Sequence, residues 1–347
     1  MNAALKSPPT AAEAEFARLF AALPADAKRQ AAFRGFAARG LPTRRDEAWH
    51  YTDLRAAWRN VAPSASMADA AAMLRDAPRW ATVRLAVVDG RFAPEISDPV
   101  PEGVTISAET TPIETRGEAP LELNVALAVG GVCIEVAAAA KVAIEIVHVV
   151  GGRDAQSVQS RVGLGVRAGA HALIIERVIG GNAGTQRNLV TSIDLEKGAA
   201  ATRVVVVADD SAIHLETLVV DLAEDATLTD FGFVSGGALT RRSLFVAQKG
   251  ERAKIALGGL ALIDGTRHAD TTLVMDHQVP NSESREYYKH VVADEGTGVF
   301  QGKVIVRQHA QKTDGGMKSH ALLLSPRATM NNKPELEIFA DDVVCAC

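Results

Sequence analysis

The sequence predicts a mainly β protein, a β-solenoid preceded by an α-helical N-terminal segment. Three observations lead to this prediction. The first 80 residues are rich in alanine, and their apolar residues recur at helical spacing. From about residue 120, short β-branched strands alternate with Gly/Asp turns at a drifting interval. Only 16 aromatic residues (Phe 10, Trp 3, Tyr 3) occur in a chain that is 47% hydrophobic, which indicates an aliphatic core.

The N-terminal segment, residues 1–80, is predicted to form three helices. Thr10 and Glu13 form a capping-box pair at the start of the first helix, which Pro24 ends. Asp26 caps the second helix, which stops at Gly40. The third helix spans residues 66–77. The apolar faces of the three helices carry Phe16, Leu19, Phe20, Leu23, Phe33, Phe36, Met73 and Leu74.

Strands are predicted throughout the second region, residues 81–347. Val83, Leu85 and Val87 alternate with other residues and run into an Asp-Gly turn at residues 89–90. Beyond residue 120, a unit of strand, short polar turn and strand recurs. The steps between turn centres are 29, 29, 27, 25, 46 and 31 residues, and we interpret the step of 46 as two units. The turn centres are Ala140, Gly169, Gly198, Asp225, Gly250, Gly296 and Arg327.

This spacing, with no helical stretch between the strands, is typical of a solenoid. In a β-helix each coil lays its strands on those of the coil below, about 4.8 Å apart. Inward positions then stack in files of aliphatic residues, which agrees with the shortage of aromatic side chains. The alternative left open by the pattern is an antiparallel sandwich or jelly roll with strands of similar length.

Charge and cysteine content limit the classes of function. Asp and Glu number 42 against 37 Lys and Arg, a formal charge of −5, so nothing favours binding to nucleic acid or to an anionic membrane. The three cysteines are too few and too scattered for a disulfide framework. The first nine residues contain no apolar signal region. We therefore expect a cytoplasmic protein.

Dispersed histidines and an isolated cysteine offer few candidate ligands. The only dense His/Asp patch comprises His268, Asp270, Asp276 and His277. A bound metal is conceivable there, but we favour surface or turn residues on a solenoid edge. Cys133 alternates with core positions and is expected to be a buried small hydrophobic residue. No stretch of the sequence matches a phosphate-loop, dinucleotide-binding or nucleophile-elbow motif.

The last residues contain the strongest candidate site. Cys345 and Cys347 are two residues apart, so on a strand their side chains point to the same side. Thiolates are natural ligands for iron–sulfur species. Because two ligands cannot complete a four-coordinate site, any cluster is expected to be transient and shared with a partner chain. No stably bound cofactor or resident metal is expected. The alternative is a frayed terminus with incidental thiols.

Two parts of the sequence contain distinctive motifs. The first is Leu41-Pro-Thr-Arg-Arg-Asp-Glu-Ala-Trp-His-Tyr-Thr-Asp-Leu54. The second has two segments. Residues 311–325 read Gln-Lys-Thr-Asp-Gly-Gly-Met-Lys-Ser-His-Ala-Leu-Leu-Leu-Ser, and residues 332–345 read Asn-Lys-Pro-Glu-Leu-Glu-Ile-Phe-Ala-Asp-Asp-Val-Val-Cys. Both parts resemble the SufB/SufD family, the scaffold proteins of the SUF iron–sulfur cluster assembly system, and the second is closest to the SufD branch.

The resemblance implies a right-handed parallel β-helix and a non-enzymatic subunit. It also implies two partners, a SufB-like chain and a SufC-like ATPase. Cys345 matches the family's cysteine after Asp-Asp-Val, whereas Cys347 replaces a histidine that the family uses at the SufB–SufD interface. The C-terminal helical segment through which the family docks the ATPase is absent from this sequence. We therefore expect a truncated chain.

Three functional hypotheses remain open from the sequence. In the first, the chain is a scaffold whose strand edge near residues 336–345 pairs with a partner, and with a second copy when isolated, giving a homodimer. In the second, the chain takes the SufB-like part and carries the cluster itself. The third, from another class, is a β-solenoid enzyme acting on carbohydrate, against which the low aromatic count argues.

Overall fold

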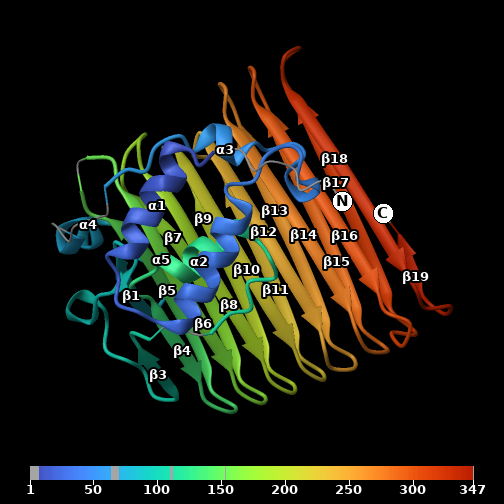
Figure 1. Ribbon diagram of the computed structural model, residues 1–347. Coiled ribbons are helices and arrows are strands. Elements are labelled where there is room, and N and C mark those ends of the chain that lie inside the picture. The colour runs from blue at the N-terminus through green and yellow to red at the C-terminus, as the bar shows by residue number, and fades with distance from the viewer. Residues whose placement is uncertain (1–7, 64–69, 110–111, 153, 347) are drawn as a thin grey trace.

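The computed structural model describes residues 8–63, 70–109, 112–152 and 154–346. The chain forms a parallel β-solenoid of about seven coils, with helices preceding it (Figure 1). The predicted solenoid is confirmed. The sandwich alternative is wrong, because neighbouring strands along the body of both sheets run parallel.

The helices are α1 (Ala11–Ala21), α2 (Ala27–Arg39), α3 (Leu54–Ala57), α4 (Ala70–Asp76) and α5 (Ala119–Leu127), with short 3-10 turns at Glu47–Trp49 and Pro94–Ile96. The first strands are β1 (Val83–Val88), β2 (Arg91–Phe92), β3 (Val104–Ser107), β4 (Val132–Val136), β5 (Lys141–Val150), β6 (Ser157–Val166), β7 (His171–Gly180), β8 (Gln186–Leu195), β9 (Ala200–Val207) and β10 (Ile213–Leu222). The later strands are β11 (Thr227–Val234), β12 (Leu239–Gln248), β13 (Lys254–Ile263), β14 (His268–His277), β15 (Glu283–Val292), β16 (Thr297–Val306), β17 (Asp314–Leu323), β18 (Thr329–Ile338) and β19 (Val344–Ala346).

The strands form two facing sheets. Even-numbered strands β4 to β18, with β3 at one edge, form sheet A, and odd-numbered strands β5 to β19, with β1 and β2 at one edge, form sheet B. The chain alternates between the sheets, so each coil contributes one strand to each. Successive strands of sheet B from β5 to β17 begin 27 to 31 residues apart.

The expected turn spacing was partly wrong. Gly169, Gly198 and Asp225 occupy turns that lead from sheet A to sheet B, each with a positive φ. Gly296 and Arg327, in contrast, lie on the opposite edge, where the chain returns to sheet A. The step of 46 residues therefore mixes the two edges and does not represent two units of 23. Both edges carry Gly/Asp turns, and the sequence pattern does not distinguish them.

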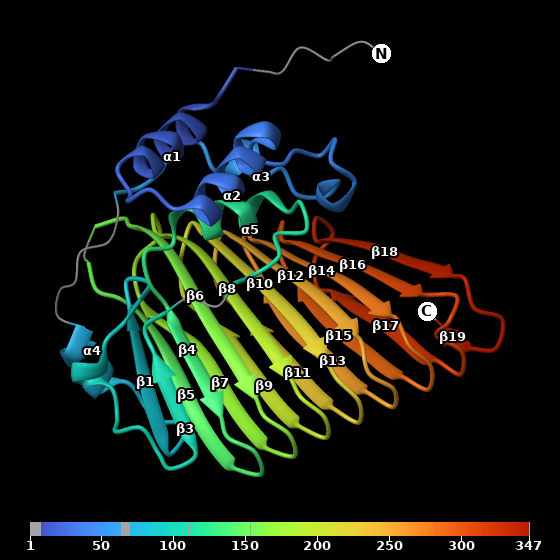
Figure 2. The same cartoon turned by 60° about the horizontal axis from the view of Figure 1, so that its bottom comes forward.

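Helices α1, α2, α3 and α5 lie over the outer face of sheet A (Figures 1 and 2). The capping box at Thr10 and Glu13 and the cap at Asp26 are present as predicted. Phe16 and Trp58 pack at 5.1 Å between ring centroids and belong to the cluster that joins the helices to β10 and β12. Among the described residues, no helix is both long and apolar enough to span a bilayer.

Helix α5 lies in a region where the sequence predicts no helix. It is apolar on nearly every side and its residues are almost all buried, so it lacks the one-sided periodicity that marks a surface helix. It packs between α2 and sheet A. Of the third expected helix, α4 forms residues 70–76 and lies against β5 instead of sheet A, whereas residues 66–69 fall outside the described part.

The space between the sheets, here called the lumen, is filled by aliphatic files, as the low aromatic content predicts. A file is here a row of side chains at equivalent positions on successive strands. In one file on sheet A, each coil supplies one buried residue, and each residue pairs in register with that of the next coil. Its members are Ile134, Leu164, Ile193, Val220, Val246, Met275 and Val304. Every side chain of the file is therefore shielded from water by the coil that follows it.

A buried ionic network interrupts the apolar lumen. Arg203 on β9 contacts Glu176 of β7, Glu216 of β10 and Asp230 of β11, at nitrogen–oxygen distances of 2.9, 2.8 and 2.8 Å. Arg242 on β12 joins the same Glu216 and Asp230, at 2.6 and 3.0 Å. Two guanidiniums thus hold three carboxylates together across five strands and both sheets.

The network keeps Glu176 and Glu216 charged. Burial alone would raise the pKa of Glu176, but Arg203 outweighs this effect and the pKa lies below its ordinary value. Burial and the Arg242 and Arg203 charges compete in the same way at Glu216, whose pKa is also lowered. Gly232 makes room for the second guanidinium, because an added Cβ would lie 1.6 Å from Nη1 of Arg242.

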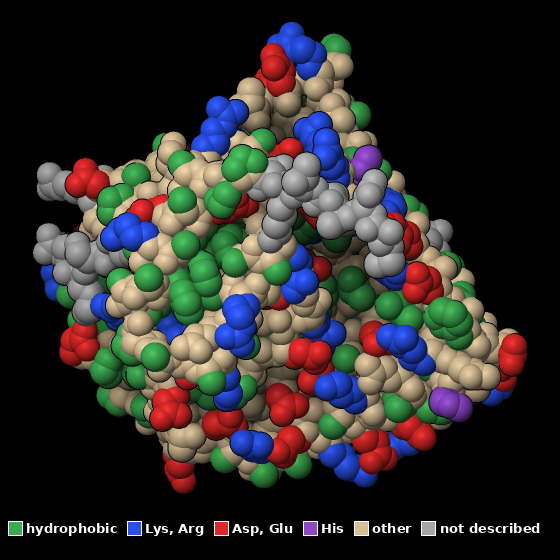
Figure 3. Space-filling view, viewed as in Figure 1, with side chains coloured by type: hydrophobic (Ala, Val, Ile, Leu, Met, Phe, Trp, Pro, Cys, Tyr) green, Lys and Arg blue, Asp and Glu red, His purple; other side chains and the backbone are tan. Residues whose placement is uncertain are grey.

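We expect Arg203→Met to destabilise the fold by about 3–5 kcal/mol, because it leaves buried carboxylates without their shared counter-charge. Urea unfolding followed by circular dichroism measures the change. Arg252→Met is the matched control, since that arginine forms ion pairs on the turn edge, where acidic and basic side chains alternate (Figure 3). An equal loss of unfolding free energy in both variants would contradict a special role for the buried network.

Candidate functional site

Cys345 lies on β19, the last strand of sheet B. This strand pairs with β17 so that Cys345 stands opposite Gly315. The backbone N–H of Val344 donates to the carbonyl of Thr313 at 2.9 Å, and Lys312 forms an ion pair with Asp342 just before the strand. These contacts fix the position of the thiol relative to the preceding coil.

The sulfur of Cys345 points toward the lumen and packs at the edge of the main apolar core. Gly315 leaves space beneath it. A Cβ at that glycine would lie 3.3 Å from Cys345 Sγ, 3.6 Å from Ser284 Oγ and 4.0 Å from His277 Nε2. The thiol, a hydroxyl and an imidazole therefore converge on one point, which we call the Cys345 pocket.

The imidazole of the Cys345 pocket is held in one orientation. Its Nδ1 lies 2.9 Å from Ser282 Oγ, and its Nε2 lies 3.2 Å from Ser284 Oγ. Burial lowers the pKa of His277 to about 4, so the ring is neutral at physiological pH. A neutral imidazole keeps a lone pair and can act as a hydrogen-bond acceptor or a metal ligand.

Glu286 on β15 lies close enough to Cys345 for its charge to act on the thiol, and both groups are neutral or partly neutral near pH 7. Burial raises the pKa of the Cys345 thiol above its ordinary value. Burial also raises the pKa of Glu286 to about 7; its side chain is 2% exposed. Neither carboxylate oxygen of Glu286 has a partner at hydrogen-bonding geometry. Since thiolates, not thiols, bind iron, the thiol must release its proton when it takes up a metal.

The described residues do not by themselves complete a metal site. Within residues 8–346, apart from the short gaps, no three His, Cys, Asp or Glu side chains are arranged to hold an ion. Cys347, the second predicted ligand, lies outside the described residues. The pairing of Cys345 with Cys347 stays a prediction. A cluster bound at Cys345 therefore needs ligands beyond the described groups.

The His/Asp patch does not converge. Asp270 accepts hydrogen bonds from Arg241 and Thr52 on the outer side of sheet A, and Asp276 is paired with Arg307 at 2.8 Å. His277 alone points to the lumen. The prediction of surface or turn residues was wrong, because all four lie on strand β14, and Asp270, Asp276 and His277 are buried. His277 belongs to the Cys345 pocket.

Cys133 was expected to be buried, and this was wrong. It is half-buried on β4, between the inward residues Val132 and Ile134. Alternation with core positions places a residue on the outer face of the sheet, which here is only partly covered.

Sequence reasoning missed His277, Ser284 and Gly315 as neighbours of Cys345. They lie on three different strands, between 30 and 70 residues before the cysteine. The one available signal was the Gly-Gly pair at residues 315–316, because glycine inside a strand often marks a close approach of other groups.

The segment 41–54 anchors the helices to sheet A. The Arg241 guanidinium lies 3.8 Å from the ring centroid of Trp49 and donates to the carbonyl of Ala48 at 2.7 Å. The Thr52 hydroxyl donates to Asp270, the carboxylate that also pairs with Arg241. Because these contacts span about 190 to 220 residues of sequence, they hold the N-terminal segment against the middle of the solenoid.

Two family models match this chain. One described as "SUF system FeS cluster assembly, SufBD core domain" covers residues 148–346, and one described as "SufBD protein N-terminal region" covers residues 20–146. The iron-sulfur cluster assembly protein SufD of Escherichia coli is 31% identical over 325 residues, which is 88% of this chain and 76% of that protein. The chain belongs to the SufBD family.

Other relatives match shorter parts. An iron-sulfur cluster assembly SufBD family protein of Synechocystis is 30% identical over 162 residues, covering 46% of this chain and 35% of that protein. The chloroplastic protein ABCI7 of Arabidopsis thaliana is 37% identical over 115 residues, which is 32% of this chain and 24% of that protein. Family membership makes the chain a SufD-like subunit of the SUF iron–sulfur cluster assembly system.

We predict that Glu286→Gln stabilises the protein increasingly as pH rises. The carboxyl has a pKa near 7 in the folded protein, against an ordinary pKa of 4.5 in the unfolded chain, so between these values only the folded state keeps the proton. The stability of the parent protein therefore falls across this interval, whereas a neutral Gln has no such cost. At 1.36 kcal/mol per pKa unit the gain reaches roughly 3 kcal/mol above pH 7.

Urea unfolding at about pH 5 and about pH 8 measures this difference. Glu283→Gln, on the outer face of the same strand, controls for the loss of a carboxylate at the surface. A Glu286→Gln effect that is independent of pH would contradict the raised pKa.

Proposed function

We propose that this chain is a non-enzymatic cytoplasmic scaffold that pairs with a SufB-like subunit through its last coil. The observation that supports this most directly is the end of the lumenal file on sheet A. Val304, its last buried member, pairs with Leu336 of β18, which is 40% exposed. Leu323 of β17 likewise follows buried Val292 in register and is 47% exposed.

These side chains continue the core but are covered by no described residue. Ile338, which pairs with the core residue Val306, continues the core in the same way and is 41% exposed. Leu322 and Val344 are also exposed, but they alternate with the lumen-facing Leu323 and Cys345 and lie on the outer face. Exposed apolar side chains that continue a core favour an interaction surface. We expect a second solenoid of the same family to present the same kind of lumenal end and to fit this one.

The outer edges of β18 and β19 also offer backbone groups for pairing. Strand addition at such an edge supplies main-chain hydrogen bonds and, through side chains, specificity. Pro334 in the middle of β18 lacks an N–H donor, so we place the pairing from Leu336 onward. This agrees with the predicted segment 336–345. In isolation the same edge would pair two copies as a homodimer.

The pairing would bring a partner's ligands to the Cys345 pocket. Cys345 stands on β19 at the same end of the solenoid as the exposed leucines, with its sulfur toward the lumen. One thiolate, assisted by Cys347, is too few for a stable cluster on this chain. We therefore assign the nascent iron–sulfur cluster, the cargo of the system, to the interface between the two subunits, where it is held transiently. A SufC-like ATPase is the third member of the proposed complex.

We expect Leu336→Glu to weaken association with a SufB-like partner by about tenfold or more, because it places a charge in an apolar contact. Analytical ultracentrifugation of the two chains mixed together measures the dissociation constant of their complex. Leu262→Glu is the control: Leu262 is also 40% exposed, on the outer face of sheet B. Loss of association in the Leu262 variant alone would place the interface elsewhere.

The cluster assignment has its own test. Anaerobic reconstitution with iron and sulfide is expected to leave the complex of Cys345→Ser with less than half the iron and acid-labile sulfide of the parent complex. Cys133→Ser should behave like the parent, since Cys133 lies on β4, far along the stack from β19. A stable stoichiometric cluster on the isolated chain would instead support the SufB-like role.

A further inference from the structure

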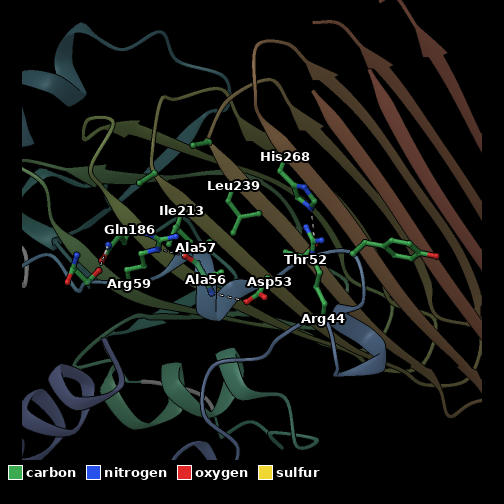
Figure 4. A pocket seen from close by; sticks show the side chains of 14 residues that line it. Arg44, Thr52, Asp53, Ala56, Ala57, Arg59, Gln186, Ile213, Leu239 and His268 are labelled. Atoms are coloured by element: carbon green, nitrogen blue, oxygen red, sulfur yellow. Dashed lines mark hydrogen bonds between the residues drawn. The ribbon is translucent and has the colours of Figure 1, made fainter. Parts of the chain in front are cut away.

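A groove lies between the N-terminal segment and the outer face of sheet A (Figure 4). Its floor contains the first residue of four consecutive strands of sheet A, which pair in register: Gln186, Ile213, Leu239 and His268. The groove therefore crosses four coils. Three inter-strand steps of about 4.8 Å give the floor a length of about 14 Å.

The groove has a volume of about 640 Å³, within the range of ligand sites, and an apolar middle. Ile213 and Leu239 form the centre of the floor, and Ala56 and Ala57 of α3 form the facing wall. Gln186 closes one end by donating to the carbonyl of Asn60 at 2.7 Å.

A guanidinium stands toward each end of the groove. Arg59 lies near Gln186, and Arg44 lies near His268 (Figure 4). Neither arginine is paired with a carboxylate among the described residues; Arg59 donates only to the carbonyl of Ala56, at 3.0 Å. Asp53, the one acidic residue among the described residues that line the groove, accepts a hydrogen bond from the backbone of Ala56 at 2.8 Å and caps α3.

A hydrogen bond fixes the polar side chains at the His268 end of the groove. His268 Nε2 lies 2.8 Å from the hydroxyl of Thr52, which is part of the anchor of segment 41–54. Burial lowers the pKa of His268, so its ring is neutral and leaves the charge of the groove to the two arginines. Segment 41–54 thus has two sides: Trp49 and Thr52 fasten it to the sheet, whereas Arg44 faces the groove.

We propose that this groove binds an extended acidic peptide segment of a partner protein, with carboxylates four residues apart and an apolar residue midway. An extended chain rises about 3.3 Å per residue, so residues i and i+4 span about 13 Å, which matches the length of the floor. Residues i, i+2 and i+4 point to the same side of an extended chain. The two carboxylates then meet Arg59 and Arg44, and the central apolar side chain meets Ile213 and Leu239.

Fluorescence anisotropy with the full chain tests the proposal. The probe is the capped peptide Glu-Ala-Leu-Ala-Glu carrying an uncharged fluorophore, and the control peptide has Gln in place of both Glu residues. We expect saturable binding of the Glu peptide, at least tenfold weaker binding of the Gln peptide, and weakening at high salt. Arg44→Glu and Arg59→Glu are each expected to weaken binding at least tenfold.

Arg45→Glu is the matched control. Arg45 is exposed next to Arg44 in sequence, does not line the groove and has no carboxylate partner among the described residues. Its variant should bind within twofold of the parent, and thermal melting checks that all three variants fold. Equal weakening by the Arg45 variant, equal affinity for the Gln peptide, or absence of saturable binding would overturn the proposal. So would equal affinity for pimelate, which has two carboxylates but no peptide backbone.

Discussion

Stacking of parallel coils is the constraint on which this structure depends. In a solenoid, each inward side chain is shielded by the coil after it, so the core has no closed boundary of its own. The file from Ile134 to Val304 is buried throughout, and its continuation at Leu336 is not. The same backbone geometry that makes the core continuous therefore leaves an apolar and hydrogen-bonding surface at the last described coil. A scaffold subunit can use that surface for assembly without evolving a separate binding domain.

Two of the polar groups in the lumen differ in character. The network of Arg203 and Arg242 with three carboxylates is fully paired, and such buried networks favour one arrangement of strands over others that an all-aliphatic core would tolerate. The Cys345 pocket is less completely paired: the buried carboxyl of Glu286 has Ser284 near it but no ion-pair partner among the described residues, and the thiol stands beside a neutral imidazole. Unsatisfied groups of this kind cluster at functional sites. The contrast supports a structural role for the first group and a functional role for the second.

The sequence predicted what depends on local patterns. The solenoid followed from strand length, turn residues and aliphatic content, and the helix caps at Thr10 and Asp26 followed from local hydrogen bonding. Helix α5 was missed because a helix buried on all sides has no apolar stripe. The neighbours of Cys345 and the ionic network depend on which coils lie next to each other, and the register of distant strands is invisible in one sequence. Thus Cys345 could be named as a candidate, and His277 only as a member of the His/Asp patch. That His277 and Ser284 lie beside Cys345 could not be predicted.

Hydrogen exchange of backbone amides tests the central claim, that the last coil is completed by a partner solenoid, most directly. The chain is measured alone, at a concentration at which it is monomeric, and again with a SufB-like partner. The account predicts that amides of β18 and β19 exchange much faster than those of β10 and β12 in the free chain, and that the partner slows them selectively. Fast exchange that the partner leaves unchanged at β18 and β19, with protection gained elsewhere, would contradict it.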